Sequence, residues 1–170
     1  MNKNILDKLY FAKINPDAII PSKNEDDGCY DCYACFGEDS IMILPDEIKL
    51  IPTGIASAFD KKYRLSVRER GSSGSKGLSV RAGQIDSGYR GEIFIAINNT
   101  TDKIILIQKE ITGAMKEEIT EGLIIYPYDK AICQLALEVV PQVQVEEISY
   151  EDLLNIESDR STGCLGSSGK

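Results

Sequence analysis

Short segments with strand-like sequence follow one another along most of this chain. Their residues alternate in polarity or are rich in β-branched side chains, and turn residues separate them. They are Leu9–Ile14, Asp31–Phe36, Ser40–Leu44, Glu47–Pro52, Gly54–Asp60, Tyr63–Glu69, Ile93–Ile97, Ile104–Lys109, Leu123–Tyr126 and Ala131–Val140. Helical sequence is confined to Asp17–Ile20 and Tyr150–Asn155. This regular spacing predicts an all-β antiparallel sandwich or barrel, and 170 residues suffice for one hydrophobic core.

The run Ala82–Glu92, which reads AGQIDSGYRGE, is the most informative motif. Its three glycines allow tight turning or close backbone approach, and it combines one carboxylate, Asp86, with one aromatic ring, Tyr89. The alternating residues Glu92–Ile97 then predict a strand that leaves the bend. A β-hairpin with such a mouth suits a small planar ligand that carries a hydrolysable group. The alternative interpretation is a solvated hairpin with an ordinary turn aspartate.

Composition excludes several classes of function. A net charge of −8 argues against a nucleic-acid partner, because phosphate neutralisation needs a basic face. The absence of histidine removes Ser-His and Cys-His nucleophile pairs, so a catalytic base has to be Asp, Glu, Lys, Tyr or Cys. We expect no membrane partner, since no segment is apolar enough to span a bilayer and the N-terminus lacks a signal-peptide profile. Five cysteines, an odd number, favour the reducing cytoplasm.

The spacing of Cys29, Cys32 and Cys35 is C-x-x-C-x-x-C, which is compatible with a zinc or iron–sulfur site. However, no fourth clustered ligand follows, and Cys133 is far away in sequence. Residues three apart on a strand point to opposite faces, so the three thiols would not converge. We therefore interpret these cysteines as structural.

Two segments rich in glycine and serine interrupt the strand pattern. Gly71–Gly77 (GSSGSKG) is either a flexible linker or an anion-binding loop, in which backbone N–H groups converge on a phosphate beside Arg70. Arg160–Lys170 (RSTGCLGSSGK) is either a mobile tail or a lid that closes over a bound triphosphate.

In their order, these pieces resemble the five signature motifs of the homotrimeric dUTP pyrophosphatases (dUTPases). The matching stretches are Gly28–Asp31, Arg70–Gly74, Ala82–Glu92, Ile132–Leu135 and Arg160–Gly169. The chain departs from the family pattern at four positions. Cys29 stands where the family has a glycine, and Cys133 stands where it has an alanine. Gly71 splits the usual Arg-Ser pair, and Leu165 replaces a phenylalanine.

The resemblance implies a trimeric, distorted jelly-roll β-barrel with active sites between subunits. Residues 1–159 would form the β domain, and residues 160–170 would form a flexible C-terminal lid. The charged segment 108–122 looks like a surface insertion of the kind found in phage-type members, and it would be the place for a regulatory protein partner.

The resemblance also implies Mg²⁺-dependent hydrolysis of dUTP to dUMP and pyrophosphate. Asp86 would orient or deprotonate the attacking water, and Tyr89 would lie beneath the deoxyribose and exclude a ribose hydroxyl. Backbone groups of Gln84 and Ile85 would recognise the uracil edge.

The remaining motifs would bind the phosphates and the metal. The implied phosphate and lid residues are Arg70, Gly71, Ser72, Ser73, Gln134, Arg160, Leu165, Gly166 and Ser167. Asp31 would hold the water shell of Mg²⁺ indirectly. From the residues alone, Asp31 is equally compatible with a strand-end turn residue, and Gln134 with a core amide bonded to backbone.

Two other functions remain open at this stage. A dCTP deaminase shares the fold but needs a catalytic glutamate near the hairpin in place of the Asp–Tyr pair. A regulatory protein on the same scaffold would act by docking a partner through the insertion.

Overall fold

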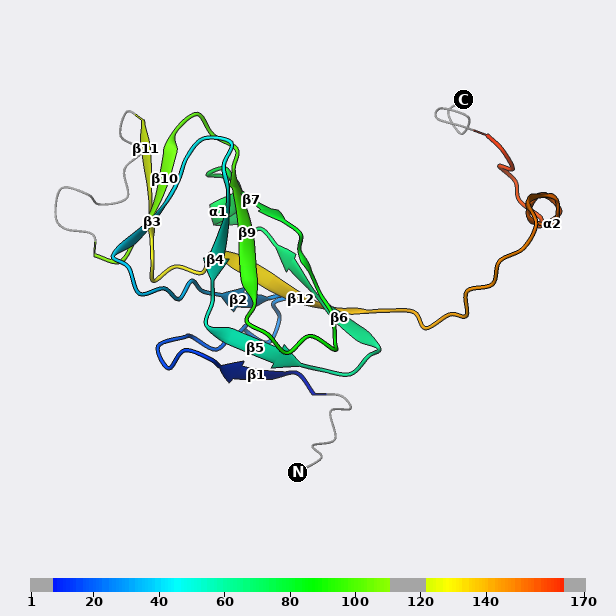
Figure 1. Cartoon of the computed structure of the whole chain (residues 1–170), viewed down its shortest axis with the longest axis horizontal. Coiled ribbons are helices and arrows are strands. Elements are labelled where there is room, and N and C mark those ends of the chain that lie inside the picture. Colours follow the sequence, from blue (N-terminus) through cyan, green and yellow to red (C-terminus); the bar gives the residue numbers. More distant parts are fainter. Residues whose placement is uncertain (1–7, 111–121, 164–170) are drawn as a thin grey trace. The chain divides into compact units, whose positions relative to one another are not determined.

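The structure is a computed structural model that describes residues 8–110 and 122–163, and nearly all its regular elements are strands (Figure 1). The strands are β1 (Tyr10–Lys13), β2 (Tyr30–Cys32), β3 (Ser40–Ile43), β4 (Ile48–Pro52), β5 (Ile55–Ala58), β6 (Tyr63–Arg68), β7 (Leu78–Arg81), β8 (Gln84–Ile85), β9 (Phe94–Asn99), β10 (Ile104–Gln108), β11 (Leu123–Pro127) and β12 (Cys133–Val139). The helices are α1 (Gly71–Gly74) and α2 (Tyr150–Leu154). The all-β prediction is confirmed.

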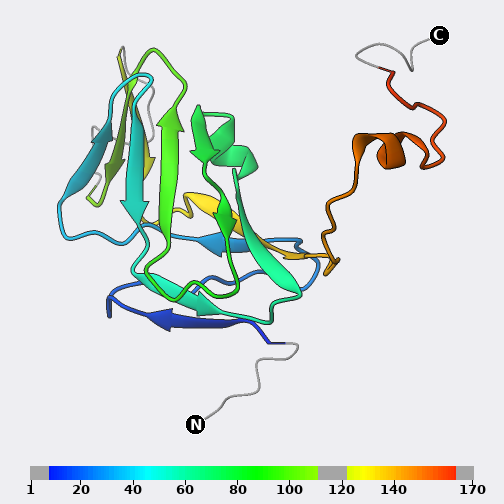
Figure 2. The same ribbon diagram turned by 45° about the vertical axis from the view of Figure 1, so that its right-hand side comes forward.

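Four small sheets make up the β body, in the orders β1-β5, β11-β10-β3, β2-β12-β6-β8 and β4-β9-β7. Figures 1 and 2 show the strands of the β4-β9-β7 sheet crossing those of the β2-β12-β6 sheet steeply, with the β1-β5 pair lying across one end. Because the chain passes repeatedly from one sheet to another, residues distant in sequence meet on the four-stranded sheet, which carries most of the candidate site residues.

The predicted strands largely agree with the observed ones, with two corrections. The strand predicted for Asp31–Phe36 ends at Cys32, and the buried residues Ala34, Cys35 and Phe36 follow in a non-strand segment whose Cys35 N–H donates to the Pro52 carbonyl instead. The helix predicted for Asp17–Ile20 is wrong: the Asn15 side chain accepts a hydrogen bond from the Asp17 backbone and makes a turn there. The helix at Tyr150–Asn155 is confirmed as α2, whereas β7, β8 and α1 were not predicted.

Strands β10 and β11 pair in parallel, with Ile104 opposite Leu123. A parallel pair cannot be closed by a tight hairpin and needs a crossover connection of about a dozen residues or more. The segment predicted as a surface insertion, 108–122, is therefore also the connection that a parallel pair requires. Its residues 111–121 lie outside the described part of the chain.

The core between the sheets is dominated by isoleucine. The fully buried isoleucines include Ile43, Ile51, Ile55, Ile95, Ile97, Ile105 and Ile107. Such β-branched side chains fit the pleated surface of a strand, and each one contributes roughly 1.5–3 kcal/mol when it is fully buried. Cys32 and Cys133 belong to the same core and lie directly opposite each other on β2 and β12.

The chain divides into two compact units, residues 1–140 and 141–170. The β body ends at Val140, and α2 belongs to the second unit. Among the described residues, no helix is long and apolar enough to cross a membrane.

One buried polar side chain organises the end of the β body where β9 turns toward β10. The Asn99 amide nitrogen donates hydrogen bonds to the carbonyls of Ile43 (3.0 Å) and Lys103 (2.7 Å). Its oxygen accepts from the Thr101 backbone (3.0 Å) and hydroxyl (2.8 Å). Asn99 is fully buried, so without it the Ile43 carbonyl and the Thr101 N–H would lose these bonds, whereas the Lys103 carbonyl would keep the one from the Thr101 hydroxyl (3.1 Å).

We expect Asn99→Ala to lower the free energy of unfolding by about 3 kcal/mol, because it leaves buried backbone polar groups unsatisfied. Asn98→Ala is the matched control, since the half-buried Asn98 donates only at 3.3 and 3.4 Å to carbonyl oxygens and accepts from the exposed Arg81 side chain at 3.0 and 3.3 Å. For the control we expect a loss of about 1 kcal/mol or less. Urea unfolding at one fixed protein concentration measures both, and equal losses would contradict this role of Asn99.

Candidate active site

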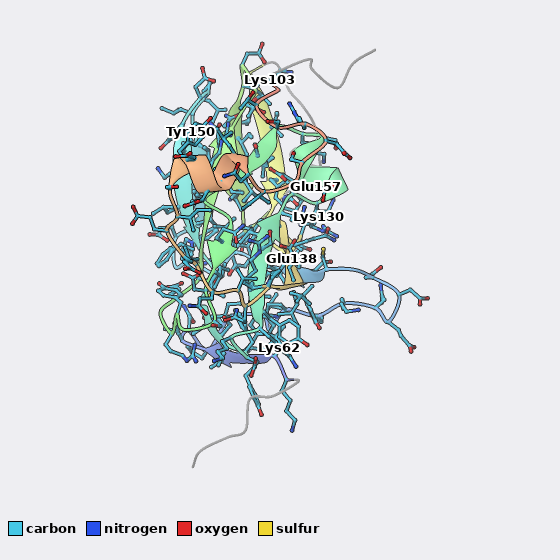
Figure 3. The ribbon with its side chains drawn as sticks, turned by 90° about the vertical axis from the view of Figure 1, so that its right-hand side faces the viewer. Lys62, Lys103, Lys130, Glu138, Tyr150 and Glu157 are labelled. Carbon is cyan, nitrogen blue, oxygen red and sulfur yellow. The ribbon has the colours of Figure 1, made fainter. Side chains whose placement is uncertain are left out.

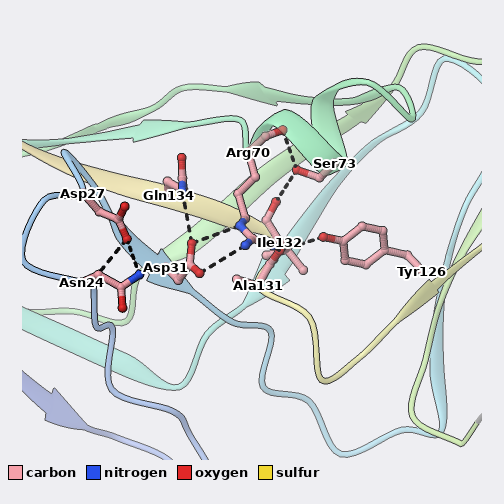
Figure 4. A network of polar contacts seen from close by, with 9 residues as sticks. All are labelled: Asn24, Asp27, Asp31, Arg70, Ser73, Tyr126, Ala131, Ile132 and Gln134. Atoms are coloured by element: carbon pink, nitrogen blue, oxygen red, sulfur yellow. Dashed lines mark hydrogen bonds and ion pairs between the residues drawn. The ribbon is translucent and has the colours of Figure 1, made fainter.

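An ion pair between Arg70 and Asp31 lies at one end of the four-stranded sheet (Figure 4). Arg70 Nε is 3.0 Å from Asp31 Oδ1, and Nη2 donates a hydrogen bond of 3.2 Å to Oδ2. The Gln134 amide donates to Oδ1 at 3.2 Å. Asp31 and Gln134 are directly opposite on β2 and β12, so their side chains share one face. The structure thus brings together predicted residues from the first, second and fourth motifs.

The same arginine is tied to the segment that leads into β12. Arg70 Nη1 donates to the Ala131 carbonyl at 3.3 Å, and the Tyr126 hydroxyl donates to the same oxygen at 2.7 Å. Tyr126 is buried, and this burial raises the pKa of its phenol above the ordinary value. The neutral hydroxyl is therefore a permanent donor at this position, and it helps to fix the approach to Gln134.

The glycine- and serine-rich segment after β6 is not a simple loop. Arg70 has extended backbone and precedes the single helical turn α1, which the Gly71–Gly74 stretch forms. The Ser73 side chain is fully buried, and its hydroxyl lies 3.3 Å from the carbonyls of Ile132 and Arg70. Gly71 and Ser72 are exposed on the same turn. Ser73 therefore fixes the turn to the start of β12, while Ser72 is open to a ligand.

Glu69 was missed by sequence reasoning, although it holds this turn in place. Its carboxylate accepts hydrogen bonds from the Val80 backbone (2.8 Å) and the Ser79 hydroxyl (3.3 Å) of β7. The Val80 bond, with smaller help from Ser79, holds the pKa of Glu69 below its ordinary value. The only signal in the sequence is that Glu69 precedes the arginine of the second motif, and this does not reveal its partner.

The run Ala82–Glu92 forms a hairpin whose two sides separate. Strands β7 and β9 pair antiparallel, but Ala82 takes a positive φ of 49° and the chain then joins a different sheet as β8, opposite β6. Gly83 is required at this point, because a Cβ there would lie 2.8 Å from the Val67 carbonyl oxygen. The predicted hairpin is therefore present, with an open mouth between β8 and β9.

A cavity of about 260 Å³ occupies this mouth. Gln84, Ile85, Asp86 and Tyr89 line it, all of them predicted site residues. Asp86 is exposed, so its carboxylate is accessible to solvent or ligand. The cavity therefore combines an apolar wall, an aromatic ring and one accessible acid.

The position of the Tyr89 ring depends on its neighbours. Its hydroxyl donates to the Glu92 carbonyl at 3.0 Å, and the ring lies so close to Gly91 that a Cβ there would be 2.5 Å from the hydroxyl oxygen. Arg90 donates to the carbonyls of Ser87 and Tyr89, and the Glu92 carboxylate accepts from the Gly54 backbone. Arg90 thus stabilises the bend through the bend's own carbonyl groups, and Glu92 ties the bend to the backbone at Gly54.

The two groups of site residues lie toward opposite ends of β6. Ile85 is opposite Leu65, whereas Gln134 is opposite Arg68, two residues before Arg70. At about 3.3 Å per residue, the five steps from Leu65 to Arg70 span roughly 16 Å, and Asp86 lies beyond Leu65 in the other direction. A single chain does not bring Asp86 to Arg70.

The second unit carries the predicted lid. The Ser149 hydroxyl caps α2 by accepting from the Asp152 backbone. Arg160 Nε donates to the Gly163 carbonyl at 2.9 Å, which makes a tight turn. Leu165, Gly166 and Ser167, which were also predicted to contact the ligand, lie outside the described residues.

Comparisons with known proteins identify the family of this chain. The family model for dUTPase matches residues 15–113. A deoxyuridine 5'-triphosphate nucleotidohydrolase of Nautilia profundicola is 32% identical over 167 residues, which cover 96% of this chain and 99% of the relative. One from a Hydrogenobaculum strain is 30% identical, with 95% of this chain and 98% of the relative covered. The chain belongs to the dUTPase family.

Solved structures show the same fold at lower sequence identity. The dUTPase of Staphylococcus bacteriophage 80alpha with dUPNHPP matches with a TM-score of 0.75 and 22% identity, covering 96% of this chain and 99% of that one. A mutant dUTPase from phage phi11, described as coordinating a structural Mg(II) ion, matches with a TM-score of 0.65 and 20% identity, covering 84% and 97%.

Adjacent serines of α1 provide a test of the site's construction. We expect Ser73→Ala to lower the free energy of unfolding by about 1–2 kcal/mol, because a buried carbonyl loses its donor. Ser72→Ala should change it by less than about 0.5 kcal/mol, as is usual for an exposed side chain. Thermal unfolding at one protein concentration compares the two variants, and equal stability would contradict the structural role of Ser73.

Proposed function

We propose that this protein hydrolyses dUTP to dUMP and pyrophosphate. Membership of the dUTPase family supports this activity, and one observation about the site supports it most directly. Asp86 and Tyr89 line the same cavity, beside the backbone of Gln84 and Ile85. That cavity offers a flat ring for a sugar, backbone groups for a base edge and a carboxylate for a water molecule.

Asp86 acts on the attacking water. Hydrolysis proceeds by in-line attack of water on the α-phosphorus, and the carboxylate orients this water and accepts its proton. The Tyr89 ring packs beneath the deoxyribose and leaves no room for a 2′-hydroxyl. Glu92 also lines the cavity, but its carboxylate accepts a hydrogen bond from the Gly54 backbone, which disfavours the alternative role of a deaminase glutamate.

The Arg70 network receives the phosphate chain. Arg70 and Gln134 supply hydrogen-bond donors beside the exposed Ser72 and Gly71. Ser73 fixes the helical turn that carries Gly71 and Ser72. The guanidinium is preorganised by Asp31, so little side-chain entropy remains to be lost when a phosphate binds.

Magnesium fits this site as an ion bound mainly by the substrate. The described residues contain no cluster of three or more acidic, cysteine or histidine ligands, and both Asp31 oxygens already accept contacts from Arg70 or Gln134. Asp31 would therefore hold water molecules of the ion rather than the ion itself. When bound, Mg²⁺ neutralises charge on the phosphate oxygens.

A complete site needs more than one chain, and we propose a homotrimer. The roughly 16 Å of β6 between the two groups of residues supports this arrangement. A second observation is the exposed apolar surface of neighbouring strands, where Ile48 and Leu50 of β4 are 56% and 64% exposed and Phe94 of β9 is 48% exposed. Apolar patches of this kind commonly mark subunit contacts.

The C-terminal residues 160–170 close the site as a lid. Arg160 brings a cation to the γ-phosphate, and Leu165, Gly166 and Ser167 cover the nucleotide. The free thiols of Cys29, Cys32, Cys35 and Cys133 support a cytoplasmic location. A regulatory partner that binds the segment 108–122 stays a hypothesis, since most of that segment lies outside the described residues.

The function is tested by measuring pyrophosphate release from dUTP, dCTP, dTTP and UTP with Mg²⁺ and with a chelator. We expect dUTP to be strongly preferred and the chelator to reduce its turnover. Asp86→Asn should reduce kcat by about a hundredfold or more while the fold is retained, the usual scale for loss of a general base. Asp102→Asn, another exposed carboxylate, is the control. Turnover of Asp86→Asn within a few-fold of the unaltered protein would assign the base elsewhere.

The lid is tested with a chain that ends at Asp159. Oligomer size should stay the same, but kcat/KM for dUTP should fall by at least about tenfold, because the γ-phosphate loses its cation. Leu165→Phe should strengthen the binding of a non-hydrolysable dUTP analogue by about 0.5–1.5 kcal/mol, the scale of one aromatic contact. If the shortened chain turns over dUTP as fast as the full chain, residues 160–170 do not form a lid.

A further inference from the structure

The sheet face that carries Asp31 and Gln134 also carries two arginines to which the proposed function gives no role. Both belong to β6: Arg68 lies directly opposite Gln134, and Arg64 lies directly opposite Glu138. Directly opposite residues of antiparallel strands project to the same face. Asp31, Gln134 and Arg68 therefore form one row across three neighbouring strands, β2, β12 and β6.

Both arginines are bound to the same carboxylate. Glu138 accepts hydrogen bonds from Arg68 Nη2 and from Arg64 Nε, the latter at 3.0 Å. In Figure 3, Glu138 lies along the sheet between Lys130 and Lys62. The arginine side chains remain 57% and 46% exposed. Exposed ion pairs contribute only about 0–1 kcal/mol, so another anion can replace Glu138 at little cost.

Position along β6 distinguishes the two arginines. Arg68 is one strand away from Gln134 and two residues before Arg70, whereas Arg64 is four residues farther along, roughly 13 Å at 3.3 Å per residue. Adjacent strands are about 4.8 Å apart, a distance that a long arginine side chain spans. Of these two arginines, Arg68 is the one that can reach a phosphate bound beside Arg70.

Charge balance favours a second cation at this place. The chain has a net charge of −8, which repels a nucleoside triphosphate. Asp31 offsets the charge of Arg70 through their ion pair. If the Arg68 guanidinium leaves Glu138, it would add two parallel donors for phosphate oxygens.

We propose that Arg68 is a further phosphate-binding residue of this site, held by Glu138 when the site is empty and turned to the phosphate chain when a nucleotide binds. The inference rests on the proposed function and deepens it. It gives Glu138 the role of a positioning residue, which competes with the substrate for one guanidinium.

The test compares Arg68→Gln with Arg64→Gln in the full chain. Both variants remove one partner of Glu138, so they share any effect on stability. Binding of an α,β-imido analogue of dUTP and of dUMP is measured by calorimetric titration with Mg²⁺. We expect Arg68→Gln to weaken binding of the triphosphate analogue about tenfold and binding of dUMP by less than about twofold. This is the scale of one lost charge-assisted contact to the phosphate chain. Arg64→Gln should change neither by more than about twofold.

Glu138→Gln provides an independent measurement, because it releases Arg68 without removing it. We expect it to bind the triphosphate analogue about two- to threefold more tightly, with dUMP unchanged. Arg68→Lys keeps the charge but not the planar donors, so its affinity for the triphosphate analogue should lie between those of the unaltered protein and Arg68→Gln.

Several outcomes would overturn the proposal. Equal weakening by Arg68→Gln and Arg64→Gln would assign the effect to the Glu138 ion pairs, and equal weakening of dUMP and of the triphosphate analogue would assign it to the fold. If the unaltered protein binds and hydrolyses dUTP while Arg68→Gln binds the analogue normally, only the role of Arg68 fails. If the unaltered protein neither binds nor hydrolyses dUTP, the proposed function fails with it.

Discussion

The ion pair between Arg70 and Asp31 connects three parts of the chain that are far apart in sequence. It joins β2, the turn that follows β6 and, through Gln134 and Ala131, the start of β12. Both side chains are about a quarter exposed, so the charges stay partly hydrated and their desolvation cost is moderate. The pair fixes the direction of a guanidinium at one end of the four-stranded sheet, where we propose that the phosphate chain binds.

Backbone constraints create the second half of the site. The positive φ of Ala82 and the close approach of Gly83 to Val67 direct β8 away from β9 and leave a cavity between them. Gly91 allows the Tyr89 ring to lie over the following backbone. Gly83 and Gly91 have a steric reason for their residue type, so the mouth of the hairpin depends on the absence of a Cβ at these two positions.

Sequence reasoning found the all-β class, most strands and the hairpin with Asp86 and Tyr89, because alternation and glycine spacing are local signals. It did not find β7, β8 or α1, since short elements next to glycines lack a periodic pattern. Glu69 and Arg68 were also missed. Their roles depend on which strands are neighbours, and that pairing is set by contacts over a sequence distance that local patterns do not encode.

The order in which the strands pair has a consequence for folding. The Gln134–Asp31 hydrogen bond closes a loop of 103 residues, and the Arg70–Asp31 bond closes one of 39. Loop closure over such distances is entropically costly, and topologies dominated by distant contacts fold slowly. During synthesis, β12 emerges last of all the strands in the described residues, so the proposed phosphate-binding end cannot form until nearly the whole β body has left the ribosome. A phosphate-bearing ligand that needs Asp31, Arg70 and Gln134 together can therefore bind only chains in which β2 and β12 have already paired.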